Sequence, residues 1–221
     1  MNLFNMRGSW KGQIAFIYDK VVAAGMDRLY ELLAETFFSN LPSDCRILDL
    51  GCGAGQVSIN IAKKNPLAEV VGVDLSHSQI ARAKKRSLNI RNANFMCGDA
   101  MRLDFPADWF DIALSVASIK HWPDQLKGLK EMRRVLKRGG TVYVFEANAQ
   151  CSQEEARNFV AKWRWVLPGT RPLVRWYFQK FIAKQALTAG ELNDLLRQAG
   201  FSDIDVQKVP GDPILVARGK K

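Results

Sequence analysis

Apolar residues recur at helical spacing near the start of the chain, and then in short runs separated by amphipathic segments. Between residues 10 and 40 they follow one face of a helix, which predicts helices that end at Pro42. From residue 46 onward, the short apolar runs predict strands over 46–50, 69–73, 94–97, 110–116 and 141–145. The segments between them predict helices: one over 56–64, one that is capped at Ser76 and includes Leu88, and one from Pro123 to Gly139-Gly140.

This alternation predicts an α/β fold with a mostly parallel sheet and helices on both of its faces. After residue 150 come two aromatic, basic helical segments, then a helix over 189–199. Strands over 201–206 and 213–217 are expected to form an antiparallel hairpin at the sheet edge. We expect a single domain with four parts: an N-terminal helical cover (1–43), a ligand-binding core (44–150), an inserted helical lid (151–186), and a C-terminal helix and strand hairpin (187–221).

The strongest chemical signal lies between the first strand and the helix that follows it. Residues 47–55 read Ile-Leu-Asp-Leu-Gly-Cys-Gly-Ala-Gly, and the glycines Gly51, Gly53 and Gly55 let a ligand approach the backbone closely. A tight strand-to-helix turn also uses glycine for structural reasons alone. Asp74, however, closes the second strand, where a carboxylate can accept hydrogen bonds from both hydroxyls of a ribose. The two features together predict an adenosine-containing ligand.

Five segments resemble, in order, the motifs of class I S-adenosyl-L-methionine (SAM)-dependent methyltransferases. They are residues 49–55, 73–76, 98–100, 110–115 and 134–140. The resemblance covers residues 46–147, with a looser match over 188–218. It implies a Rossmann-like methyltransferase sheet, SAM as the methyl donor, and S-adenosylhomocysteine as the product.

The resemblance also implies which residues bind the cofactor. Asp49 would order the glycine loop or meet the amino group of SAM, Asp74 would bind the ribose, and Asp99 would accept a hydrogen bond from the adenine amine. A helix cap or turn residue is the alternative interpretation of each aspartate, strongest for Asp99. The expected set, in which Leu75 and Ile80 pack on the purine, is Tyr18, Asp49, Gly51, Gly53, Gly55, Asp74, Leu75, Ile80, Asp99, Ala100 and Ser115.

His121 is the candidate catalytic residue. It follows the fourth strand, at the carboxyl end of the sheet, where α/β proteins bind ligands. Since a sulfonium already carries an activated methyl group, the enzyme mainly aligns the reactants, and it needs a base only if the acceptor must lose a proton. His121 is one of two histidines, and its near-neutral pKa suits either that base or a packing role beside Trp122.

The acceptor is predicted to be small and apolar or lipid-like. The place after strand four holds Ser-Val-Ala-Ser (115–118) instead of the loop of nucleic-acid amino-methyltransferases, and no cysteine lies between Cys97 and Cys151 to act as a cytosine-C5 nucleophile. Residues 17–30 and 214–220 resemble ubiquinone/menaquinone-biosynthesis methyltransferases, in which a Tyr-Asp pair covers the donor, here Tyr18-Asp19. The chain departs from that family between strand five and the last helix.

That divergent stretch combines aromatic and basic residues at helical spacing. It holds seven basic residues and two acids, and such an amphipathic segment is typical of a membrane-interface element or of a lid over an apolar pocket. Ordinary packing with a solvated basic face is the alternative. The whole chain has a net charge of +10, which favours an anionic partner, either an anionic membrane surface or, less in keeping with the motifs, nucleic acid.

Composition places the chain among globular proteins and leaves alternatives open. No apolar run is long enough to span a bilayer, no secretory signal opens the sequence, and the four scattered cysteines lack zinc-site spacing, so we expect a cytoplasmic protein with reduced thiols and no metal. The sequence does not indicate an oligomeric state. Two other functions remain open: an RNA methyltransferase, with salt-dependent RNA affinity, and a non-catalytic SAM-binding sensor or scaffold.

Overall fold

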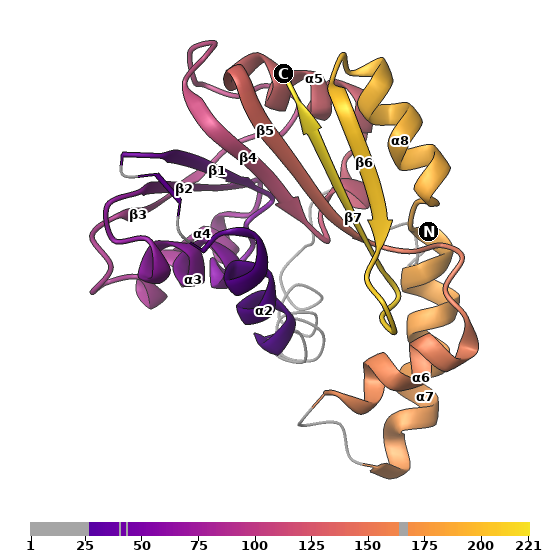
Figure 1. The fold of residues 1–221 in the computed structure, drawn as a ribbon. Helices are drawn as coiled ribbons and strands as arrows, with labels where there is room; N and C mark the ends of the chain where they lie inside the picture. Colours follow the sequence, from indigo (N-terminus) through magenta and orange to yellow (C-terminus); the bar gives the residue numbers. More distant parts are fainter. Residues whose placement is uncertain (1–26, 40, 43, 164–167) are drawn as a thin grey trace.

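The computed structural model describes residues 27–39, 41–42, 44–163 and 168–221. These residues form a seven-stranded sheet in the order β3-β2-β1-β4-β5-β7-β6 (Figure 1). Strand β7 runs against the other six, because it pairs antiparallel with both β5 and β6. The strands are Arg46–Leu50 (β1), Glu69–Asp74 (β2), Ala93–Cys97 (β3), Phe110–Val116 (β4), Leu136–Ala147 (β5), Ser202–Lys208 (β6) and Ile214–Lys220 (β7). The predicted fold class is therefore confirmed, including the terminal hairpin.

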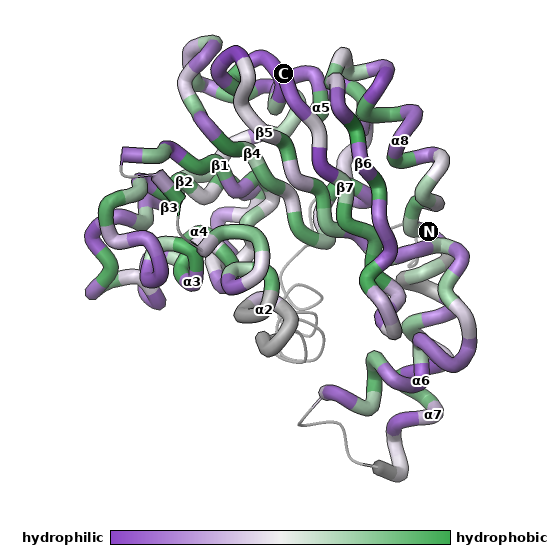
Figure 2. Tube along the Cα trace, in the orientation of Figure 1, coloured by the Kyte–Doolittle hydropathy of each residue, from purple (hydrophilic) through white to green (hydrophobic). Residues whose placement is uncertain are grey.

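Helices cover both faces of the sheet (Figure 1). Neighbouring strand residues point to opposite faces: Ile47 packs with α2, α3 and α4, whereas Leu48 packs with α5 and α8. Strands β1 and β4 and the second half of β5 are largely hydrophobic, as two-sided burial requires (Figure 2). The helices are Asp27–Phe37 (α2), Gln56–Lys64 (α3), His77–Arg86 (α4), Gln125–Val135 (α5), Gln153–Ala161 (α6), Arg171–Tyr177 (α7) and Ala189–Gln198 (α8).

Two predicted helix ends are wrong. Helix α4 stops at Arg86, and Leu88 lies beyond it with 80 % of its surface exposed. Helix α5 stops at Val135, so Gly139 and Gly140 lie within β5 instead of closing a helix. The reason is a pairing between distant segments: Leu136 pairs with Phe110, and the register then shifts so that Thr141 pairs with Ile112. The predicted helices before residue 27 lie outside the described residues.

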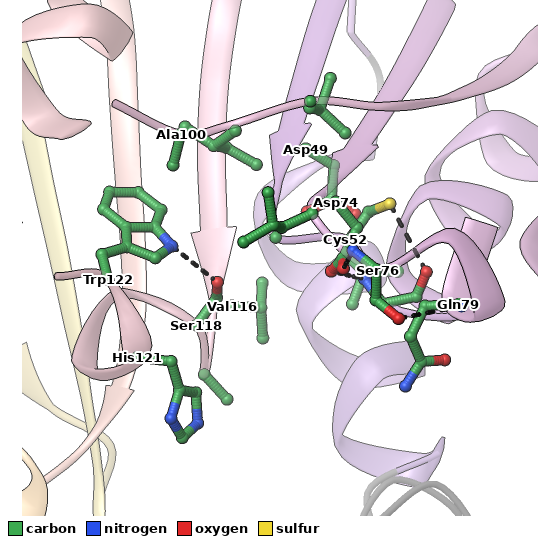
Figure 3. A pocket seen from close by; sticks show the side chains of 18 of the residues that line it. Asp49, Cys52, Asp74, Ser76, Gln79, Ala100, Val116, Ser118, His121 and Trp122 are labelled. Atoms are coloured by element: carbon green, nitrogen blue, oxygen red, sulfur yellow. Dashed lines mark hydrogen bonds between the residues drawn. The ribbon is translucent and has the colours of Figure 1, made fainter. Parts of the chain in front are cut away.

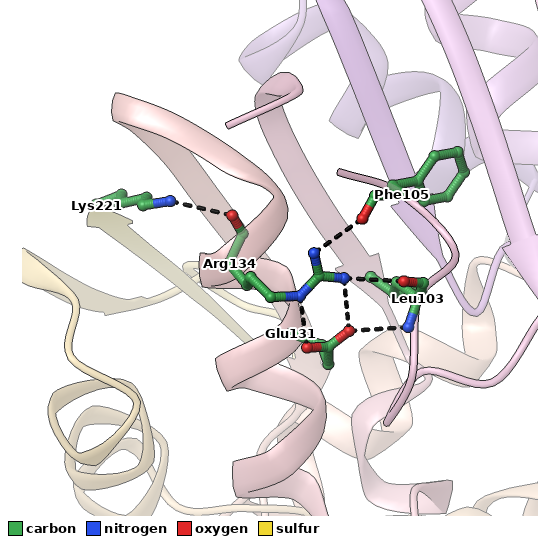
Figure 4. A network of polar contacts seen from close by, with 5 residues as sticks. All are labelled: Leu103, Phe105, Glu131, Arg134 and Lys221. Atoms are coloured by element: carbon green, nitrogen blue, oxygen red, sulfur yellow. Dashed lines mark hydrogen bonds and ion pairs between the residues drawn. The ribbon is translucent and has the colours of Figure 1, made fainter. Parts of the chain in front are cut away.

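Arg134 fixes the end of α5 to the loop between β3 and β4 (Figure 4). Its guanidinium donates to the carbonyls of Phe105 and Leu103, both at 2.8 Å, and to both carboxylate oxygens of Glu131. Glu131 in turn accepts a hydrogen bond from the backbone N–H of Leu103. This hydrogen bond network holds in place the loop that contributes Asp99 to Met101 to the site described below.

We expect Arg134→Lys to destabilise the protein by about 1–2 kcal/mol, because a lysine cannot serve two carbonyls and a carboxylate at once. Urea unfolding measures the change. The control is Arg138→Lys, since Arg138 is an exposed residue that joins no such network, and it should leave the free energy of unfolding unchanged. Equal effects of the two substitutions would contradict the role given to Arg134.

Candidate functional site

A cleft lies at the carboxyl ends of β1, β2 and β4, where these parallel strands meet (Figure 3). Four chain segments form it: the glycine loop after β1, the turn from β2 into α4, the segment after β3, and the turn after β4 that leads into a short 3-10 helix, Ile119–His121 (η3). The lining includes Tyr30, Asp49, Gly51, Cys52, Gly53, Asp74, Leu75, Ser76, Gln79, Gly98, Asp99, Ala100, Met101, Val116, Ala117, Ser118, His121, Trp122 and Pro123.

The glycine loop approaches its neighbours too closely for side chains. At Gly51, with φ +78°, an added Cβ would lie 1.8 Å from the Ser118 Oγ, so this position is closed to other residues. At Gly53, with φ +54°, the same added atom would meet nothing within 4 Å, because the position faces the open cleft. Gly51 thus joins the two halves of the site, while Gly53 exposes backbone to a ligand.

Asp74 ties the glycine loop to the second strand. One carboxylate oxygen accepts a hydrogen bond from the Ser76 N–H at 2.8 Å, and the other accepts one from the Gly53 N–H at 2.9 Å. Burial raises the pKa of this carboxyl, and the two hydrogen bonds act against the increase. Since each carboxylate oxygen has a second lone pair, Asp74 keeps acceptor capacity for a ligand in the cleft.

Asp49 lies deeper, at the floor of the cleft, with 1 % of its surface exposed. Its carboxylate accepts a hydrogen bond from the Ser58 Oγ at 2.5 Å. Burial raises its pKa to about 7, and the nearby Asp74 adds to the increase, whereas the hydrogen bond from Ser58 opposes it. Because this carboxyl is half protonated near neutral pH, a cation placed beside it would shift it strongly toward the ionised form.

Asp99 and Gln79 complete this side of the cleft. The Asp99 carboxylate accepts a hydrogen bond from the Met101 N–H at 2.9 Å, so part of its role is that of a turn residue. Leu75, half exposed, offers an apolar surface at the rim. Gln79, 8 % exposed, has a side-chain oxygen with no hydrogen-bond partner among the described residues. Sequence reasoning missed Gln79, although the cap at Ser76 sets the helix phase that turns it inward.

Three predicted cofactor residues do not line the cleft. Ile80 is 4 % exposed and packs in the hydrophobic core with Phe95 and Ala83, one helix position away from Gln79. An added Cβ at Gly55 would strike the same Phe95 ring, at 2.8 Å, so this glycine serves packing. Ser115 is fully buried within β4. Tyr18 lies outside the described residues.

The opposite side of the cleft is formed by the turn after β4 (Figure 3). The Trp122 indole N–H donates to the Ser118 Oγ at 3.0 Å, which fixes both side chains against the glycine loop. His121 lies at the end of η3, partly buried. Apart from His121, the residues that this side contributes have no titratable side chain; they are Val116, Ala117, Ser118, Trp122 and Pro123.

A buried ion pair anchors this turn from below. The Lys120 Nζ lies 2.6 Å from the Glu146 Oε1, with side-chain exposures of 4 % and 0 %. The same ammonium donates to the carbonyl of Ala117 at 2.9 Å, and Ala117 has the left-handed φ of +53°. Glu146 belongs to β5, so the pair fastens the turn that carries His121 to the middle of the sheet.

Among the described residues no group of three or more His, Cys, Asp or Glu side chains could hold a metal ion. No helix in the described ranges is long and apolar enough to cross a bilayer. The cysteines Cys45, Cys52, Cys97 and Cys151 are not joined by disulfides in the structure.

Comparisons with known proteins agree with the site. Residues 47–140 match the model of a methyltransferase domain. The demethylmenaquinone methyltransferase of Staphylococcus aureus is 29 % identical over 182 residues, which cover 80 % of this chain and 76 % of that protein.

Solved structures share the fold at low sequence identity. A putative SAM-dependent methyltransferase of Methanococcus maripaludis superposes with a TM-score of 0.73, at 20 % identity, over 97 % of each chain. The cyclase SpnF superposes with a TM-score of 0.68, at 23 % identity, over 88 % of this chain and 81 % of its own. The solved structures thus share the fold of this chain, and residues 47–140 are similar to a methyltransferase domain.

Proposed function

We propose that this enzyme methylates a small, apolar or amphiphilic acceptor, which enters beside the turn after β4. The observation that carries the proposal is the composition of that side of the cleft, where His121 is the one titratable side chain among the described residues that the segment after β4 contributes to the lining. A largely apolar wall with one titratable group selects by shape and burial, not by charge. The S. aureus relative, named for demethylmenaquinone, supports an acceptor of the quinol type.

The other side of the cleft fits an adenosine-containing cofactor. The open space at Gly53 lies next to the carboxylate of Asp74. The buried side-chain oxygen of Gln79, which has no hydrogen-bond partner among the described residues, can accept a hydrogen bond from a ligand. We assign the ribose hydroxyls to Asp74, the adenine edge to Asp99 and Ala100, and the purine face to Leu75. Gln79 would accept a further hydrogen bond, and Asp49 would meet the cationic end of the cofactor.

SAM supplies a methyl group that is already activated by its sulfonium. The chain therefore has to orient the acceptor, keep water out and, for a hydroxyl or ring-carbon acceptor, remove one proton. The Trp122–Ser118 hydrogen bond holds the apolar wall in place. With SAM bound, the acceptor atom would bond to the methyl carbon as the bond from that carbon to sulfur breaks and S-adenosylhomocysteine leaves, and His121 would take the acceptor proton on a ring nitrogen.

The test is turnover with a set of candidate acceptors and SAM, followed by mass spectrometry of the products. A short-chain demethylated naphthoquinol, a catechol and an aliphatic amine represent carbon, oxygen and nitrogen acceptors. We expect methylation of the naphthoquinol above the other two. Preference for the amine, or methylation of RNA instead of any small molecule, would overturn the proposal.

We expect His121→Gln to lower kcat about a hundredfold while leaving the Kd for SAM unchanged, because a glutamine cannot accept the proton. Single-turnover rates and calorimetric titration with SAM measure the two quantities. The chain offers a matched control in His77→Gln, since His77 is the other histidine and lies exposed at the start of α4, outside the cleft lining. Unchanged turnover in His121→Gln would contradict the role of His121 as the general base.

A further inference from the structure

The two most exposed large hydrophobic residues in the described part of the chain lie at the edge of the sheet opposite the cleft. Leu67 is 74 % exposed in the loop between α3 and β2, and Leu88 is 80 % exposed in the loop between α4 and β3. Both loops lead into parallel strands, so they lie at the amino ends of these strands, whereas the cleft lies at the carboxyl ends. A partner bound at this edge would leave the cleft open.

Asn92 holds the two loops side by side. Its side-chain amide donates to the carbonyls of Ala62, Asn65 and Ala68, at 3.0, 3.0 and 2.9 Å. These carbonyls belong to the end of α3 and the loop after it, whereas Asn92 belongs to the loop after α4, and both helices lie on the same face of the sheet (Figure 1). The two exposed leucines therefore stand on loops that are fixed to each other.

Trp109 extends the apolar edge to the start of β4. It is 38 % exposed just before that strand, and the guanidinium of Arg46 lies 4.2 Å from its ring centroid. Arg46 also pairs with Glu69, two residues after Leu67, at 3.6 Å. Arg46 thus covers part of the indole and connects the start of β4 with the starts of β1 and β2.

Cations without carboxylate partners border this edge. Residues 75–98 contain no acidic residue, whereas they contain five lysines and arginines. Three of these, Lys84, Lys85 and Arg91, are exposed within four positions of Leu88 in the sequence. No carboxylate in the described part of the chain forms an ion pair with any of the three.

The carboxylates at the same edge are mostly engaged. Glu69, Asp108 and Asp111 each form an ion pair with a lysine or arginine. Asp44, before β1, forms none within the described ranges, so one free carboxylate stands against the three free cations around Leu88. Aliphatic and aromatic groups bordered by free cations complement the interface of a bilayer that carries anionic headgroups.

We propose that this edge of the sheet docks on an anionic lipid surface through three apolar and three cationic side chains: Leu67, Leu88, Trp109, Lys84, Lys85 and Arg91. The apolar groups enter the headgroup region, and the cations contact lipid phosphates. A membrane fits better than a nucleic acid, because the two most exposed members of the edge are aliphatic leucines, which neither stack on bases nor contact phosphate. The proposal does not depend on the cofactor or the acceptor, since docking is measured without turnover.

The test is co-sedimentation of the full chain with two kinds of vesicle: phosphatidylcholine alone, and equal parts of phosphatidylcholine and phosphatidylglycerol. We expect binding to the mixed vesicles and little to the neutral ones. Leu67→Ser and Leu88→Ser should each weaken binding about tenfold, because each removes an apolar group from the interface. Lys84→Gln with Lys85→Gln should weaken it about thirtyfold at low salt and have little effect at high salt.

Residues on other elements provide matched controls. Leu173 is 66 % exposed on α7, and Lys127 and Lys130 are exposed on α5. Leu173→Ser, and Lys127→Gln with Lys130→Gln, should bind the mixed vesicles like the unchanged protein. Circular dichroism and urea unfolding check that each variant is folded. The proposal is overturned by absence of binding to the mixed vesicles, by equal losses in the control variants, or by binding that follows a single-stranded RNA probe instead of lipid.

Discussion

Lys120→Met is expected to lower the free energy of unfolding by about 3–5 kcal/mol, because it leaves a buried carboxylate without its counter-ion. Glu146 has no exposed side-chain surface, and its closest partner is the Lys120 ammonium at 2.6 Å. The substitution also removes the hydrogen bond that satisfies the carbonyl of Ala117. Urea unfolding, monitored by circular dichroism, measures the loss.

A surface ion pair of similar length serves as the control. Lys137 lies 2.7 Å from Asp111, but their side chains are 41 % and 34 % exposed, so Lys137→Met should cost less than about 1 kcal/mol. The double variant Lys120→Met/Glu146→Gln should recover more than half of the lost stability, since it buries no charge and keeps an acceptor for the Ala147 N–H. A cost for Lys120→Met no larger than that for Lys137→Met would show that the pair is solvated.

Asp49→Asn is expected to stabilise the ligand-free protein above pH 7 and to weaken SAM binding. The native pKa of about 7 lies above the unfolded value of about 3.9. The folded chain thus binds a proton that the unfolded chain has released, and stability falls as pH rises from about 4 to about 7, by up to about 4 kcal/mol. Asparagine carries no charge and keeps an acceptor for Ser58. The stability of the variant should therefore not fall in this way as the pH rises.

Unfolding free energies across that pH range measure the stability effect, and calorimetry measures the binding. Glu131→Gln supplies the opposite case. The hydrogen bond from Arg134 lowers the pKa of Glu131 from its ordinary value of 4.5, so the stabilisation is fully present above about pH 4.5 and disappears as the solution becomes more acidic. If Asp49→Asn and the unchanged protein show parallel stability curves, then Asp49 is ionised in the free enzyme throughout this range.

The periodic part of the fold was predictable because its signals are local. Helix α3 has the predicted bounds, since Gly55 precedes it and Asn65-Pro66 ends it. Strand β4 likewise has its predicted length, because five of its seven residues are apolar, with Asp111 and Ser115 between them. The start of β5 was missed because Leu136 becomes a strand residue only through its pairing with Phe110, a contact between distant segments.

In the site too, features with local sequence signals were predictable, and features that depend on contacts between distant segments were not. Asp74 and the glycine loop follow from motif positions, and the structure brings them together through the Gly53 N–H. The resemblance to the methyltransferase motifs implies that Ile80 packs on the purine, but the position of Ile80 in α4 turns it to the core and turns Gln79 into the cleft. The Lys120–Glu146 pair has no sequence signal, because it joins a turn after β4 to a residue in β5.

The order of the strands has a consequence for synthesis on the ribosome. β7 inserts between β5 and β6, so a strand made after both of them fills an internal place in the sheet. A nascent or truncated chain that stops before Ile214 leaves β5 with an unpaired edge next to a hydrophobic face, the kind of surface that recruits other chains. Premature termination before Ile214 should therefore yield aggregates instead of a shortened enzyme.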